Sequence, residues 1–260
     1  MRALVWFWAV VLMLAGGVGA VLAWLGPPAR EAVPVADVAR PAAPPAPLPL
    51  ATGPKIAILI AGIGMRTHQS RVAIASLPPA VSLAISPYAP DPAAAALAAR
   101  KAGHEVLVSL PMQPGQGAIA DAGDEELAAS QPADVTASRL AWALGRVPAP
   151  AGATSLLAPG LDGDAFTASP ALASVMDKLA SRHLWFLDGR RATMLDAPAT
   201  TPAHALAALI ALARRKGSAI GAAGAPSPDL VAALERLLPG LAARGVRLVP
   251  VGQIISQAKQ

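Results

Sequence analysis

The sequence predicts an α/β fold with a parallel sheet of seven to eight strands, either open or closed into a (β/α) barrel. Three observations carry this prediction. Apolar, β-like runs alternate with helical patterns through most of the chain after residue 55. The first run, residues 56–60, is continuous, as expected for a strand buried on both faces of a parallel sheet. Several helix starts carry a capping side chain followed by proline. The number of runs favours the barrel but does not decide whether the sheet closes.

The strands are expected at seven apolar runs. These are residues 56–60, 81–86, 105–110, 153–157, 184–187, 218–222 and 246–251. In a parallel sheet, ligands bind just outside the carboxyl ends of the strands, an edge that we call the mouth. The first strand ends in Ala61-Gly62-Ile63-Gly64, so it brings no reactive side chain to the mouth.

The helices between the strands begin with a recurring signal. Four starts pair a capping residue with proline: Asp91-Pro92, Ser169-Pro170, Thr201-Pro202 and Ser227-Pro228. After the second and third of these, apolar residues recur on one helical face, which indicates helices that pack on the sheet. These residues are Leu172, Val175, Met176 and Leu179 in one helix and Leu206, Leu209, Ile210 and Ala213 in the other.

The N-terminal part of the chain predicts a membrane tether. Residues 3–25 contain no charge and are long enough to span a bilayer. Arg2 precedes the segment and Arg30 is the next cation, which favours a single-pass anchor in the inner membrane with the N-terminus inside. A signal peptide that is cleaved to release the protein into the periplasm is the alternative, because Val18-Gly19-Ala20 has small residues at suitable spacing. Residues 26–54 hold nine prolines and predict an extended linker, which leaves residues 55–260 as one periplasmic domain.

Composition excludes several classes of function. The chain has no cysteine, so disulfides and thiolate metal sites are absent. Its net charge of +5 is diffuse, and aromatic residues make up only 3% of the chain. The densest basic cluster, Arg214-Arg215-Lys216, ends a predicted helix before Gly217, where cations complement the helix dipole. We therefore expect no nucleic-acid partner.

Glycines and histidines give weak signals of chemistry. Gly62-Ile63-Gly64 follows a strand, but Thr67 stands where a dinucleotide fingerprint needs its third glycine, so a tight turn is the better interpretation. The four histidines are His68 and His204 in first helical turns, His183 closing a helix, and His104 before a strand, away from the mouth. None is paired with a carboxylate at the spacing of metal ligands.

Three aspartates are better placed than the histidines to reach the mouth. Asp188 follows the run 184–187, with Arg190 two residues on, and Asp162 and Asp164 lie in the loop after residues 153–157. Two neighbouring carboxylates at the mouth could hold a cation or act as acid and base. Such residues also commonly form turns or pair with arginine, so both interpretations stay open.

Several blocks of the chain, in order, resemble the divergent polysaccharide deacetylase family, an envelope branch of the (β/α)-barrel carbohydrate esterases. The blocks are KIAILIAGIG, LPPAVSLAISPYAP followed by ARKAGHEVLVSLPMQP, RHLWFLDGR, ARRKGSAIG and LERLLPGLAARGVRLVPV. They extend through most of residues 55–260. The resemblance implies a distorted deacetylase-like barrel and a role in carbohydrate metabolism.

The chain departs from that family at the polar positions. The first strand of the family ends in two aspartates, which match Ala61 and Gly62 here. A histidine of its third strand and the following glutamate match Ser109 and Gln113. The chain is also short around residues 191–195, as if a helix before the sixth strand of the family were missing.

Two further histidines of the family fall on Ala158 and, within a residue, on Gly224, whereas Asp188 is retained beside Gly189. Related deacetylases use one aspartate and two histidines to hold a divalent metal and another aspartate as the base. The resemblance therefore implies a scaffold that lacks these side chains. We expect no catalytic residue, no metal and no other cofactor.

The leading hypothesis is a membrane-tethered pseudoenzyme that binds cell-envelope glycan or an envelope protein at its mouth. The polar residues expected there are Ser109, Gln113, Asp162, Asp164, Asp188 and Arg190. One alternative is an active deacetylase or other hydrolase whose rearranged site uses Asp162, Asp164 or Asp188. A second alternative is an envelope scaffold without affinity for glycan.

Overall fold

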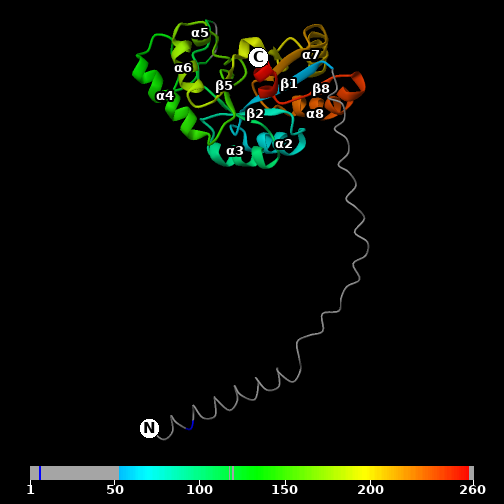
Figure 1. Cartoon of the computed structure of the whole chain (residues 1–260), viewed down its shortest axis with the longest axis horizontal. Coiled ribbons are helices and arrows are strands. Elements are labelled where there is room, and N and C mark those ends of the chain that lie inside the picture. Colours follow the sequence, from blue (N-terminus) through cyan, green and yellow to red (C-terminus); the bar gives the residue numbers. More distant parts are fainter. Residues whose placement is uncertain (1–5, 7–52, 117, 119, 258–260) are drawn as a thin grey trace. The chain divides into compact units, whose positions relative to one another are not determined.

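A computed structural model describes residues 6, 53–116, 118 and 120–257 (Figure 1). The predicted anchor at residues 3–25 and nearly all of the linker lie outside these residues. Within the described part, no helix combines the length and the apolar character needed to cross a membrane. The tether therefore stays a prediction.

The centre of the domain is a parallel sheet. Its strands are β1 (Lys55–Ile63), β2 (Ser82–Ile85), β3 (Val106–Ser109), β4 (Gly152–Thr154), β5 (Trp185–Leu187), β6 (Thr193–Met194), β7 (Ser218–Ala223) and β8 (Arg247–Leu248). Their order is β5-β4-β3-β2-β1-β7-β6, and β8 pairs with the first residues of β1. Each of the seven predicted runs overlaps a strand, which confirms the parallel α/β architecture. The two-residue strand β6 was not predicted.

The sheet forms a half-barrel, which supports the predicted barrel fold but is not closed into a ring by the described strands. In the described chain β5 and β6 are the two edges, and no pairing joins them. The link between them is only a 3-10 turn, η1 (Gly189–Arg191), without a helix to return the chain to the amino ends of the strands. The chain instead crosses the mouth, and β6 pairs only with the carboxyl half of β7, Thr193 opposite Gly221 and Met194 opposite Ala222.

Helices cover the outside of the half-barrel (Figure 1). They are α2 (Thr67–Ser76), α3 (Pro92–Lys101), α4 (Ala133–Arg146), the short α5 (Asp164–Thr167), α6 (Ala171–Ala180), α7 (Pro202–Lys216) and α8 (Pro228–Leu237), followed by the 3-10 segment η2 (Leu238–Arg244). The last helix, α9 (Val251–Gln257), packs instead on β1, β5 and β7 from the inner side. The run 246–251 was predicted to be one strand, but its end turns into α9.

This arrangement gives the domain two apolar clusters, one on each face of the sheet. Alternate residues of β1 divide between them. Ile56, Ile58 and Ile60 belong to the outer cluster with the covering helices, and Ala57, Leu59 and Ala61 belong to the inner cluster with α9. Burial on both faces explains why the sequence of β1 is continuously apolar.

Three of the four predicted caps are confirmed. The side chains of Asp91, Thr201 and Ser227 accept hydrogen bonds from backbone N–H groups at the starts of α3, α7 and α8. The prediction for Ser169 was wrong, because its hydroxyl donates to the Phe166 carbonyl at 2.8 Å and α6 begins at Ala171 without a side-chain cap. The hydroxyl of Ser169 therefore bonds to a carbonyl of the preceding helix α5 instead of capping α6.

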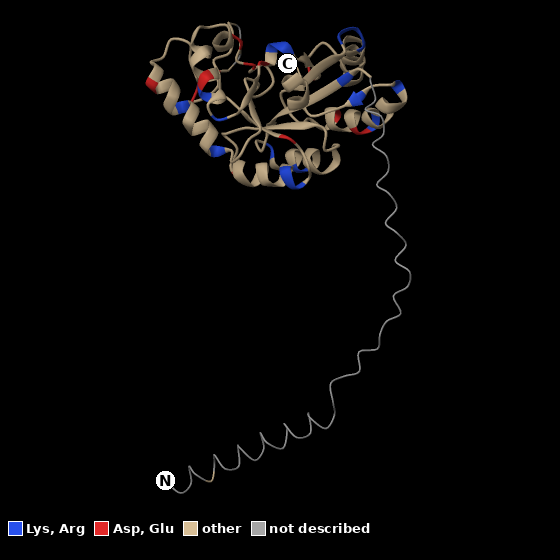
Figure 2. Ribbon diagram, in the orientation of Figure 1, with Lys and Arg blue, Asp and Glu red and all other residues tan. Residues whose placement is uncertain are grey.

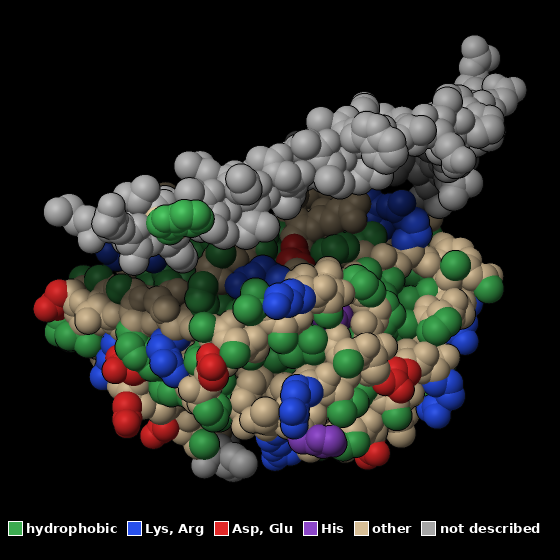
Figure 3. Space-filling view, turned by 90° about the horizontal axis from the view of Figure 1, so that it is seen from below, with side chains coloured by type: hydrophobic (Ala, Val, Ile, Leu, Met, Phe, Trp, Pro, Cys, Tyr) green, Lys and Arg blue, Asp and Glu red, His purple; other side chains and the backbone are tan. Residues whose placement is uncertain are grey.

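Charged side chains lie mainly on the helices and loops, while the central strands are almost uncharged (Figure 2). On the visible described surface in Figure 3, Lys and Arg side chains are dispersed among acidic and hydrophobic ones. The basic cluster Arg214-Arg215-Lys216 ends α7, before Gly217 in a left-handed conformation with φ of 81°. It therefore occupies the helix end that the sequence predicted.

Candidate functional site

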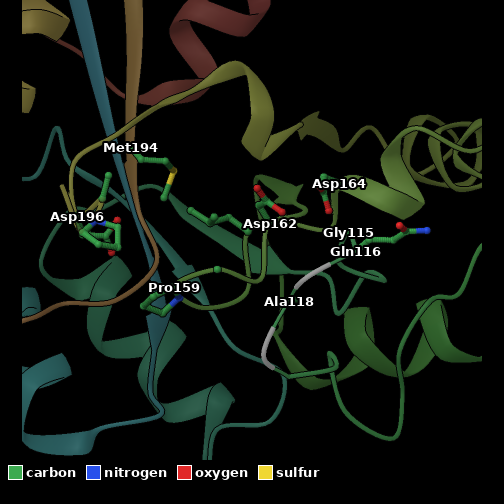
Figure 4. A pocket seen from close by; sticks show the side chains of 12 residues that line it. Gly115, Gln116, Ala118, Pro159, Asp162, Asp164, Met194 and Asp196 are labelled. Atoms are coloured by element: carbon green, nitrogen blue, oxygen red, sulfur yellow. The ribbon is translucent and has the colours of Figure 1, made fainter. Parts of the chain in front are cut away.

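A cavity of about 640 Å³ lies at the mouth. Loops that follow three strands enclose it: Gly115 after β3, Pro159 after β4, and Asp196 after β6. Three carboxylates line different parts of the cavity wall, those of Asp162, Asp164 and Asp196. Figure 4 shows Asp196 on one side and Asp164 on the other, with Asp162 between them. Apolar surface from Leu156, Pro159, Met194 and Pro198 completes the lining.

Asp162 and Asp164 were predicted at the mouth, and the structure places both on this cavity. Asp164 is the first residue of α5, and its carboxylate lies against Gly115, where a methyl group would come within 2.6 Å of Oδ1. That Oδ1 is buried and has no hydrogen-bond partner among the described protein atoms. Because this oxygen is buried against Gly115, it is an unsatisfied acceptor behind the cavity wall and not an exposed contact for a ligand.

Asp188 and Arg190 form an ion pair rather than a cavity wall. The Arg190 guanidinium donates to Asp188 Oδ2 at 2.8 Å, and its Nη2 also donates to the Thr167 carbonyl at 3.3 Å. Asp188 in addition caps η1 by accepting from the Arg190 backbone N–H at 3.0 Å. The hydrogen bonds that Arg190 donates to Asp188, helped by the nearby charges of Asp164 and Asp162, raise the pKa of Arg190. The structure therefore favours the arginine-partner interpretation for Asp188.

Ser109 and Gln113 are less exposed to the mouth than predicted. Ser109 ends β3, is fully buried, and its Oγ has no partner among the described atoms. Gln113 braces the loop after β3, because its Oε1 accepts from the Ala129 N–H at 2.9 Å. Gln113 lines only a shallower hollow beside the main cavity, together with Asp121 and Glu126.

Asp196 was missed by the sequence analysis. It follows the unpredicted strand β6, and its Oδ2 accepts from the Gly224 N–H at 2.8 Å. Burial raises the pKa of Asp196, although hydrogen bonds from backbone N–H groups oppose the shift. One signal was available, because Met194-Leu195-Asp196 repeats the pattern of Phe186-Leu187-Asp188, two apolar residues followed by an aspartate.

The histidines lie away from the cavity. His104 is buried, and its Nδ1 and Nε2 lie 2.8 and 3.0 Å from the carbonyl oxygens of Val81 and Ile74. His68 and His204 are exposed in the first turns of α2 and α7, and His183 is exposed just beyond α6. None of them lines the cavity.

The comparisons with known proteins agree with this fold. A family model described as "Divergent polysaccharide deacetylase" matches residues 58–199 and 189–255. The chain belongs to this family. No curated protein sequence matches the chain.

The chain is also similar to a solved structure. It is that of the uncharacterized protein ATU2773 from Agrobacterium tumefaciens C58, with a TM-score of 0.71 and 28% sequence identity. The match covers 78% of this chain and 89% of that one. The fold of the domain is therefore shared beyond this chain.

The residues at the mouth do not fit the metal that the family resemblance implies. In the described part of the chain, no three His, Asp or Glu side chains are grouped so as to hold an ion. The positions matched to family ligands, Ala61, Gly62, Ala158 and, within a residue, Gly224, have no donor side chain. Two of them are also in close backbone contact, because a methyl group at Gly62 would lie 2.8 Å from the Gly224 carbonyl oxygen.

Proposed function

We propose that this member of the divergent polysaccharide deacetylase family is a catalytically degenerate, membrane-tethered module that binds cell-envelope glycan in the cavity at its mouth. One observation carries the proposal: a cavity of about 640 Å³ combines three carboxylates with apolar walls. The volume falls within the usual range of ligand sites, and sugars present both hydroxyl groups and apolar ring faces. Asp162, Asp164 and Asp196 would accept hydrogen bonds, while Met194 and Pro159 would contact the ring faces.

Binding is favoured over catalysis by the identity of the side chains. In metal-dependent hydrolysis the ion polarises the carbonyl group and supplies a hydroxide near neutral pH. The residues at the family ligand positions do not provide for such an ion. No histidine lines the cavity to act as a general acid or base, and Asp188 is held by Arg190. These features support a binding role for the fold.

The test is calorimetry of the purified full chain with oligomers of N-acetylated hexosamine, together with an assay for released acetate. We expect saturable binding and no acetate. Asp162→Asn should weaken binding about tenfold, because it removes a charged acceptor from the cavity. The matched control is Asp177→Asn, which alters an exposed aspartate of α6 and should bind like the native chain.

Other outcomes of this experiment support the alternatives. Acetate release that is lost on Asp162→Asn, Asp164→Asn or Asp188→Asn would favour an active deacetylase or hydrolase with a rearranged site. No binding to any glycan, combined with specific cross-linking to an envelope protein, would favour a protein-binding module or scaffold.

We also propose that residues 3–25 anchor the chain in the inner membrane and that the domain lies in the periplasm, on the strength of the uncharged segment after Arg2. Alkaline phosphatase fused to the C-terminus should be active, with the fusion retained in the membrane fraction. An active fusion in the soluble fraction, with a new N-terminus after Ala20, would indicate signal cleavage instead. An inactive fusion would overturn the orientation.

A further inference from the structure

Three loops at the mouth meet through their backbones. Gly62 near the end of β1, Gly224 just after β7, and Ala158-Pro159 after β4 form a contact that we call the seam. A methyl group at Gly62 would lie 2.8 Å from the carbonyl oxygen of Gly224. A methyl group at Gly224 would lie 2.6 Å from both the carbonyl carbon of Ala158 and the Cα of Pro159. Distances under about 3 Å leave no room for any side chain, since carbon atoms in contact lie at about 3.5–4.0 Å.

Both glycines of the seam are buried, and neither position is free to carry another residue. Gly62 has φ of 65°, in the left-handed region that favours glycine. The backbone at Gly224 has no such requirement, so crowding alone excludes a side chain there. Position 224 is therefore a glycine because the β4 loop approaches its backbone closely, and not because a turn requires a positive φ there.

Hydrogen bonds hold the seam in place from two sides. The Gly224 N–H donates to Asp196 Oδ2 at 2.8 Å, which ties the loop after β7 to the segment after β6. On the other side the Gly64 N–H donates to the Ser70 hydroxyl at 2.9 Å, which ties the end of β1 to α2. These hydrogen bonds therefore help to fix the loop after β7 and the end of β1 where they meet at the seam.

We infer that the backbone seam stands in the place of the metal in this chain and holds together the same strand ends that an ion would join. The seam consists of the positions matched to family ligands on the first strand and on two later loops. An ion needs side-chain donors at about 2.0–2.2 Å and space for them between the loops. Because the loops are in direct backbone contact, replacing side chains one at a time does not recreate that space. The seam lies at the metal position, so its role does not depend on which ligand the neighbouring cavity binds.

The seam also divides the mouth. The cavity with Asp162, Asp164 and Asp196 has Leu156 and Pro159 in its wall. A second cavity of about 370 Å³ is lined by the intervening residues Leu157 and Ala158, together with Met65 and Ser86. Successive residues of the β4 loop thus face two separate hollows, and the acid-lined cavity lies beside the metal position and not on it.

The first test compares alanine substitutions at glycines in the purified full chain. Gly224→Ala should lower the Tm by about 5 °C or more, because a methyl group is forced against the backbone of the β4 loop. The control, Gly240→Ala, adds the same methyl group at a position in η2 with no neighbouring atom within 4 Å, and its Tm should stay unchanged. Equal Tm values for Gly224→Ala, Gly240→Ala and the native chain would contradict the close backbone contact at Gly224 and so overturn the inference.

The second test uses the native full chain and therefore does not depend on whether Gly224→Ala folds. Thermal melts are recorded with increasing zinc chloride and, separately, with a chelator. A ligand that binds the folded state raises the Tm in a saturable way. We expect no saturable rise with zinc and no fall with chelator. A saturable rise that corresponds to one zinc per chain by elemental analysis would show that the mouth accepts a metal and would overturn the inference.

Discussion

The two ends of the half-barrel are closed in different ways. At the amino end, two side chains of the sheet bind the start of α9. Glu105 Oε2 accepts from the Ser82 hydroxyl at 2.7 Å and from the Gly252 N–H of α9 at 3.1 Å. Ser82 Oγ in turn accepts from the Val251 N–H at 3.0 Å. At the mouth, the backbone of Gly224 meets that of the β4 loop without any side chain between them.

This difference determines which kind of substitution destabilises each end. A closure made by side chains weakens when one polar partner is removed, because the remaining buried groups lose their hydrogen bonds. A closure made by backbone contact contains no side chain that a substitution could remove. It is disturbed instead when a substitution adds a side-chain atom between the loops. The three carboxylates of the cavity beside the seam are then left for contacts with a ligand, although Asp196 also supports the seam by accepting from the Gly224 N–H through Oδ2.

The largest effect outside the seam is expected at Glu105. Glu105→Ala removes the acceptor of the Ser82 hydroxyl and of the Gly252 N–H, so the free energy of unfolding should fall by about 2–3 kcal/mol. Urea denaturation of the full chain measures this loss. Glu235→Ala, at an exposed position of α8, is the control and should change the stability by less than about 0.5 kcal/mol. Similar losses in both variants would mean that the polar lock at the amino end contributes little.

A smaller effect, dependent on pH, is expected at Asp196. Its folded pKa is raised above the ordinary value of 3.8, chiefly by burial. Between these two pKa values the folded state binds more protons than the unfolded state, so this group makes stability fall as the pH rises, and above the folded pKa its contribution is constant. Asp196→Asn removes the titration while it keeps a carbonyl oxygen that can accept from Gly224.

Urea denaturation of the native chain and of Asp196→Asn at several pH values between about 3.5 and 7 tests this expectation. The stability of the variant minus that of the native chain should increase with pH. A difference that decreases with pH would mean that hydrogen bonds to the carboxylate outweigh its burial. The seam would then depend on the charge of Asp196.

Sequence reasoning located the elements of the fold better than it located the site. The continuous run in β1 and the caps at Asp91, Thr201 and Ser227 are local signals, and the structure confirms them. Asp162 and Asp164 were placed at the mouth because they follow a strand, and both line the cavity. Asp196 was missed because β6 has only two residues, too few to show a periodic pattern.

The sequence by itself determined the parallel α/β architecture, the family, and the absence of donor side chains at Gly62, Ala158 and Gly224. Strand periodicity, capping and family blocks depend on residues close together in the chain, so they can be recognised without coordinates. Only the tertiary structure decided that the sheet stays open between β5 and β6 and that the mouth is closed by backbone. The contacts of Gly62 with Gly224, and of Gly224 with the β4 loop, join residues far apart in the chain and depend on the packing of the whole domain. Because a glycine has no side chain, its polarity cannot be used to predict such a contact from the sequence.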